Sequence, residues 1–149
     1  MEPANNHSAI ATSANHEKLP LAIGAGLVAA AVGAAVWAVV TVTTGYQIGF
    51  MAIGIGFLVG WTIRNIGKSS SQIFGVAGAS LALLGCVAGN ILATVGFAAH
   101  GESLPFMSVL SRLTLSMIPG VLTESFNAMD LVFYGIATYE GYKLSLARA

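Results

Sequence analysis

The fold is decided by an uncharged stretch, LPLAIGAGLVAAAVGAAVWAVVTVTTGYQIGFMAIGIGFLVGWTI, at residues 19–63. As one helix, these 45 residues would be about 67 Å long, twice the roughly 30 Å hydrocarbon core of a bilayer. The stretch must therefore reverse direction. Its segment TVTTGYQ, residues 41–47, combines β-branched threonines with Gly45, which weaken a helix, and with Tyr46, which suits a membrane interface. We predict spans near 20–41 and 46–64, joined there.

The overall composition agrees with a membrane protein. Apolar residues make up 56% of the 149 residues, and charged residues only 8%, whereas soluble domains carry about 25% charged residues. A net charge of zero provides no basic surface, so we exclude nucleic acid as a partner and expect the lipid bilayer instead. The single cysteine, Cys86, excludes a disulfide framework and a multi-cysteine zinc site, and no cofactor is predicted.

The rest of the chain predicts an all-α integral membrane bundle of about four transmembrane helices over residues 19–149. Further spans are expected near 73–99 and 128–146, the latter opened by a capping pair, Asn127 with Asp130. Between them, the 103–123 region has an amphipathic pattern that predicts an interfacial or re-entrant helix near 104–118, ended by Pro119-Gly120. Residues 1–18 lack a sustained apolar period and are interpreted as a disordered cytoplasmic tail.

The positions of Lys and Arg predict the orientation, because cytoplasmic loops retain these residues and translocated loops carry few. A four-span topology with the N-terminal tail inside leaves only Arg112 on the outer side. The other five cations are then cytoplasmic: Lys18, Arg64, Lys68, Lys143 and Arg148. We therefore predict a multi-pass protein of the cell membrane with both termini in the cytoplasm.

Small residues at four-residue spacing form ridges on the first three predicted spans. Because lipid gives no hydrophobic drive for helix association, such ridges promote close backbone packing. We interpret them as packing surfaces within the chain, with a dimer face or a pore lining as the alternatives. The glycines concerned are Gly26, Gly56, Gly60, Gly85 and Gly89.

Two intramembrane polar residues, Glu140 and Asn90, form the candidate polar site. Glu140 follows Asp130 by ten residues, about 15 Å of helix, so both cannot reach opposite headgroup layers. A structural interpretation pairs Glu140 with a cation near the cytoplasmic interface: Lys143, Arg64 or Lys68. A functional interpretation makes Glu140 a proton or cation carboxylate, assisted by Asn90, Tyr134 or Tyr139. For Asn90 itself, interhelical hydrogen bonding is expected.

Two blocks of the sequence resemble a family of uncharacterised small bacterial four-span integral membrane proteins. They are GYQIGFMAIGIGFLVGWTIRNIGK at residues 45–68 and AMDLVFYGIATYEGYKLS at residues 128–145, and FGVAGASLALLGCVAGN at residues 74–90 fits the same pattern. The resemblance implies a protein of the bacterial inner membrane. Family likeness of this kind implies topology and supplies no mechanism.

Three functions are compatible with these features. The first is a non-enzymatic helper or scaffold that packs against another membrane subunit or forms a homo-oligomer. The alternative is a small ion or solute transporter or channel that uses Glu140 and Asn90 along a hydrated path. An intramembrane enzyme is the least favoured, because no catalytic set shows a convincing spacing, so no catalytic or metal-binding residues are assigned.

Overall fold

The computed structural model describes residues 4–147, with side chains from residue 18 onward. The helices are α1 (Ala4–Thr44), α2 (Phe50–Gly67), α3 (Gln72–Gly101), α4 (Phe106–Arg112), α5 (Ile118–Ser125) and α6 (Ala128–Ser145). Over these residues the fold is all-α, as predicted, and contains no strand.

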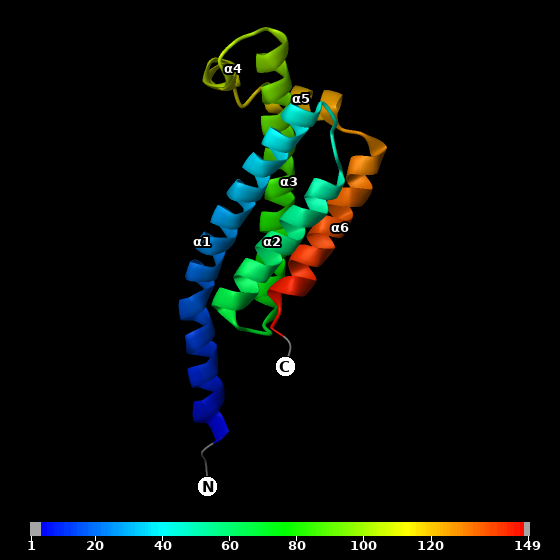
Figure 1. The fold of residues 1–149 in the computed structure, drawn as a ribbon. Coiled ribbons are helices and arrows are strands. Elements are labelled where there is room, and N and C mark those ends of the chain that lie inside the picture. Colours follow the sequence, from blue (N-terminus) through cyan, green and yellow to red (C-terminus); the bar gives the residue numbers. More distant parts are fainter. Residues whose placement is uncertain (1–3, 148–149) are drawn as a thin grey trace.

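Four long helices, α1, α2, α3 and α6, pack lengthwise into one bundle (Figure 1). Helices α1 and α3 run in one direction and α2 and α6 in the other, with α2 and α3 each in contact with the other three. Helices α4 and α5 lie at the end of the bundle where α3 finishes, and we call residues 102–127 the cap. Both described ends of the chain lie at the opposite side from the cap.

Three of these helices are long and apolar enough to cross a membrane, namely Lys18–Thr44 of α1, α2 and α3, with mean hydropathies of 2.2, 1.3 and 2.0. The chain is therefore a membrane protein. Helix α6 is not one of the three, because its 18 residues include Asp130, Glu140 and Lys143. It nevertheless packs against both α2 and α3 within the bundle.

The predicted turn after the first span is confirmed. Helix α1 ends at Thr44, and Gly45 adopts a φ of +71°, a left-handed conformation that costs glycine little. The Gly45 amide donates to the Thr41 carbonyl at 3.0 Å, which closes the last helical turn. The chain then crosses to α2 without regular structure, and α2 begins at Phe50 rather than near residue 46.

The tail and the segment after α3 differ from the sequence expectation. The backbone is helical from Ala4, so disorder over residues 1–18 is wrong for residues 4–18, while residues 1–3 lie outside the described part. Adding residues to an existing helix needs no new nucleus, which favours this extension of α1.

A single helix near 104–118 is also wrong. Helix α4 ends at Arg112, and Leu113 is extended with ψ of 109°. Pro119, expected to end a helix, instead stands in the first turn of α5, where its missing N–H costs no hydrogen bond.

The start of α6 agrees with the expected capping pair. The backbone N–H of Asn127 donates to Asp130 Oδ2 at 2.9 Å. An acidic side chain in the first turn also complements the helix dipole. Asp130 is only 6% exposed, so this carboxylate is more buried than a position at the water boundary implies.

Candidate functional site

Side chains from three parts of the chain form a polar network in the half of the bundle nearest the cap, and it is buried except at Gln47. Asn90 of α3, 1% exposed, accepts a hydrogen bond from Gln47 Nε2 at 3.4 Å. Its Nδ2 donates to the Tyr134 hydroxyl of α6 at 3.2 Å. That hydroxyl donates in turn to the Cys86 carbonyl of α3 at 3.2 Å. Asn90 therefore bonds across helices, as its position within a span predicts.

Aromatic rings enclose this polar network. Trp37 of α1 is fully buried and meets the Tyr134 ring edge to face, with centroids 6.3 Å apart. Phe126, at the end of α5, meets the same ring at 5.5 Å. Gly89 makes room for the indole, since a Cβ there would lie 2.9 Å from Trp37 Cε3. Close approach of α1 and α3 at Gly89 thus helps to position Tyr134.

Two buried polar atoms beside the network have no hydrogen-bond partner: Trp37 Nε1 and Thr41 Oγ1. Thr41 follows Trp37 by one helical turn and is fully buried. Other helical threonines bond back to the carbonyl four residues earlier, as Thr138 does to Tyr134 at 2.7 Å. The Thr41 hydroxyl does not make this bond, although in any helix the carbonyl four residues earlier is within reach of a threonine hydroxyl.

The chemistry available in the polar network is that of neutral hydrogen-bonding groups. The Tyr134 hydroxyl is both donor and acceptor, and both polar atoms of the Asn90 amide are bonded. The nearby Asp130 carboxylate accepts from the Asn127 amide and so caps α6. Among the described residues, no group of three or more His, Cys, Asp or Glu side chains could hold a metal ion. The arrangement can fix the register between α3, α6 and the α1–α2 connection.

A recess of about 420 Å³ adjoins the Tyr134 ring on the side of the cap. Its lining is almost entirely apolar and consists of Val87, Leu122, Thr123, Phe126 and Tyr134. The Thr123 hydroxyl already donates a hydrogen bond to the Pro119 carbonyl at 2.6 Å. The recess therefore offers no free polar group that could orient a ligand.

Glu140, the other candidate polar residue, lies outside this network. It is half-buried on α6, six residues after Tyr134, which is about 9 Å farther along the helix axis. Within the described side chains, it forms no ion pair with Arg64, Lys68 or Lys143. Lys143 instead places its Nζ 5.4 Å from the centre of the Tyr139 ring. The structure thus does not bring Glu140 and Asn90 into one site.

All five predicted packing glycines face other helices of the same chain. A Cβ at Gly56 would meet the Ala137 backbone, with its Cα at 2.9 Å, and one at Gly60 would lie 2.7 Å from Leu144 Cβ. Gly26, Gly85 and Gly89 make equally close approaches to side chains of α2, α3 or α1. These positions lie at close helix contacts within the chain, and their role as packing surfaces stays a prediction.

Two features of the interior were not predicted from the sequence. One is the crossing of α3 and α6, where a Cβ at Gly141 would lie 2.7 Å from the Gly78 carbonyl oxygen. The other is Gln47, which lies in the predicted turn and carried no sign that it would reach Asn90. A polar residue next to a reversal between spans is the signal that could have suggested such a bond.

No family model, curated protein or solved structure matches this chain. The resemblance of residues 45–68 and 128–145 to small bacterial membrane proteins therefore stays a prediction.

Proposed function

We propose that this chain is a non-enzymatic helper or scaffold subunit of the bacterial inner membrane, built as four spans with both termini in the cytoplasm. The observation that carries the proposal is the polar network, in which Asn90 bonds to both Gln47 and Tyr134. Such bonds hold helices in one register, which suits a rigid scaffold. A transport path would instead need a series of free polar groups across the bundle, whereas the two unpartnered atoms, Trp37 Nε1 and Thr41 Oγ1, lie one turn apart on α1.

The arrangement of α6 supports a fourth span. Its 18 residues extend for about 27 Å, and it lies beside α2 and α3, both of which are apolar enough to cross the membrane. Asp130 lies in its first turn and Lys143 in its last, while Glu140 is half-buried about one turn before Lys143. Burial against two neighbours lowers the cost of the less apolar sequence.

The distribution of charges supports the orientation. Arg64, Lys68 and Lys143 lie toward the end of the bundle opposite the cap, where both described chain ends also lie (Figure 1). The cap contains one cation, Arg112. By the positive-inside rule, the cap faces outward and the termini face the cytoplasm.

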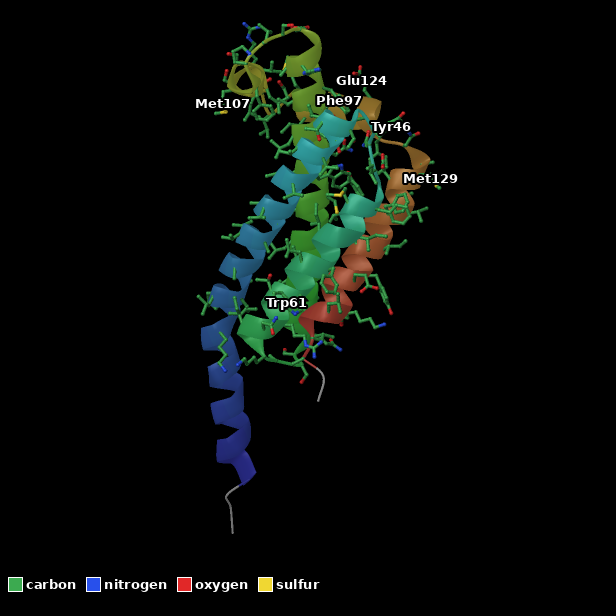
Figure 2. The ribbon with its side chains drawn as sticks, in the orientation of Figure 1. Tyr46, Trp61, Phe97, Met107, Glu124 and Met129 are labelled. Carbon is green, nitrogen blue, oxygen red and sulfur yellow. The ribbon has the colours of Figure 1, made fainter. Side chains whose placement is uncertain are left out.

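An exposed stripe on α2 is the surface that we assign to a partner helix. It consists of Phe50, Gly54, Phe57 and Trp61, and we call it the α2 stripe. The three aromatic side chains are each more than half exposed, and Figure 2 shows Trp61 on the outside of the bundle. A Cβ at Gly54 would meet nothing within 4 Å. A glycine between large side chains leaves a notch where another membrane helix can approach closely.

The test is extraction from native membranes with a mild detergent, followed by native mass spectrometry. We expect a different membrane subunit in a fixed ratio to this chain. The Gly54→Leu variant should lose that subunit, because leucine fills the notch. The matched control is Gly24→Leu on α1, where a Cβ also meets nothing within 4 Å, and it should retain the subunit.

Two results would count against the helper role. A homo-oligomer without any other subunit would favour the transporter alternative, and so would ion or solute flux that disappears in Glu140→Gln vesicles. The present separation of Glu140 from the polar network leads us to expect no such flux. Retention of the subunit by Gly54→Leu would reject the α2 stripe as its binding surface.

A further inference from the structure

An open groove of about 650 Å³ lies between α1 and α3 next to the cap. Its walls come mainly from small or apolar residues of the two helices, and Phe106 of α4 closes one side. The lining residues include Ala35, Val39, Leu92, Gly96, His100 and Phe106. A concave site of this size, apolar with few polar groups, is typical of a small-molecule binding site.

The end of α3 is folded so that the cap covers part of this groove. The Leu104 amide donates to the Ala99 carbonyl at 2.9 Å, and the Ser103 amide donates to the His100 carbonyl at 3.3 Å. With Ser103 at a φ of +54°, these bonds form a Schellman motif, which usually has glycine at this position. The reversal brings Phe106 to within 4.0 Å of the Cβ position of Gly96.

The groove lining is polar at one end only. Thr43 lies in the last turn of α1, while His100 and Ser103 lie at the end of α3, so these three groups gather toward the cap. Farther from the cap, Ala35 and Leu92 leave the wall without polar side chains. Such a lining matches an amphiphile, with a hydrocarbon tail along the helices and a polar head beside the cap.

The surroundings identify the tail as a lipid acyl chain. The groove runs along the last third of two helices that are apolar enough to cross a membrane, and its edge residue Val39 is 62% exposed. An apolar groove that opens onto hydrocarbon does not fill with water. Leaving it empty would forfeit dispersion contacts along its walls. An acyl chain from the neighbouring lipid layer would fill the groove without water and would make the dispersion contacts along its walls.

The charges near the cap select among headgroups. Two exposed carboxylates, Glu102 and Glu124, stand at this end of the bundle against one exposed cation, Arg112 (Figure 2). This excess disfavours a lipid with net negative charge and favours one that carries an ammonium group. The C-terminal ends of α1 and α3 also favour an ammonium group, because the free carbonyl groups at a helix C-terminus attract cations.

We propose that this groove binds one acyl chain of a zwitterionic phospholipid with a primary ammonium headgroup, and that the headgroup lies beside His100 and Ser103. Phosphatidylethanolamine has this chemistry. The proposal rests on the embedding of α1 and α3 in the membrane and does not depend on a partner at the α2 stripe. The lipid proposal and the proposed partner at the α2 stripe can therefore fail separately.

The test compares two exposed alanines on one face of α1. Ala35 lines the groove, and Ala31, one turn earlier, does not. The full-length protein is purified in detergent, incubated with equal amounts of phosphatidylethanolamine and phosphatidylglycerol, and examined by native mass spectrometry. We expect one retained phosphatidylethanolamine per chain. Ala35→Phe should weaken retention about tenfold, as expected for displacing roughly two buried methylenes. Ala31→Phe should leave it unchanged.

Thermal unfolding of both variants checks that the fold is retained. Equal losses in Ala35→Phe and Ala31→Phe would overturn the groove as the site. Retention of several lipids in the ratio supplied would mean that the lipids are only annular, and preferred retention of phosphatidylglycerol would overturn the headgroup assignment. A dimer of this chain that dissociates in Ala35→Phe would make a second copy the occupant instead.

Discussion

At the scale of single residues, Asn90 connects the greatest number of buried polar groups. Replacing it by leucine removes the acceptor of Gln47 Nε2 and the bond that the Tyr134 hydroxyl accepts, while that hydroxyl keeps its bond to the Cys86 carbonyl. We expect Asn90→Leu to lower the free energy of unfolding by about 1–3 kcal/mol, because it removes two hydrogen bonds between different parts of the bundle. The measurement is reversible unfolding in mixed micelles of increasing denaturing detergent.

The control for Asn90→Leu is Asn65→Leu on α2. Asn65 is exposed, and its Nδ2 donates to the Trp61 carbonyl of its own helix at 2.9 Å. Because no second helix is involved, its replacement should change stability by less than about 0.5 kcal/mol. Equal effects at the two positions would show that the polar network does not connect the helices energetically.

Thr41 provides a second prediction at this scale, with the opposite sign. Its buried hydroxyl has no partner, so the isosteric Thr41→Val change removes an unsatisfied polar group. We expect stability to rise by about 1 kcal/mol. Thr62→Val, which loses a bond of 2.7 Å to the Leu58 carbonyl, should not be stabilising. A loss of stability in Thr41→Val would mean that a bound molecule satisfies this hydroxyl.

At the scale of helices, glycines set the distance between α2 and α6. A methyl group on Gly56 would meet the Ala137 backbone, which cannot move aside as a flexible side chain does. Gly56→Ala should therefore destabilise the bundle by about 1–3 kcal/mol through overpacking. Gly54→Ala, two residues earlier on the same helix, enters open space and should stabilise α2 by about 0.5–1 kcal/mol. The pair is compared by the same unfolding measurement.

The critical result is whether Gly54→Ala and Gly56→Ala change the free energy of unfolding in opposite directions. If Gly54→Ala proves as harmful as Gly56→Ala, then the outer face of α2 is also packed closely in the membrane. That outcome, measured in lipid, would support a partner at the α2 stripe. In purified monomeric protein it would contradict the packing of α2 against α6.

At the scale of the whole molecule, the bundle predicts which connections share a side of the membrane. In a Cys86→Ser background, single cysteines replace Ser70, between α2 and α3, and Thr114, between α4 and α5. A membrane-impermeant maleimide added to intact cells should label Thr114→Cys only. Ser70→Cys should react only after the cells are opened. Labelling of both positions from the same side would reject the proposed topology.

Much of the helical framework follows from local chemistry. The absence of charge over residues 19–63 predicts two apolar helices, and Gly45 marks where the first one ends. The Asn127–Asp130 pair predicts the start of α6, because a capping bond joins residues only three positions apart. Pro119 shows the limit of such signals. Proline is compatible with the first turn of a helix and with the region after its end, so the pattern alone did not reveal that it begins α5.

The sequence by itself determined that the chain is apolar, all-helical and reversed near Gly45, because bilayer thickness and backbone hydrogen bonding depend only on composition and spacing. It also marked the glycines along which helices pack. Only the tertiary structure decided that Asn90 meets Gln47 and Tyr134, which lie 43 and 44 positions away, and that Glu140 does not join them. Such meetings depend on the rotation and register of whole helices, which are set by the sum of many side-chain contacts.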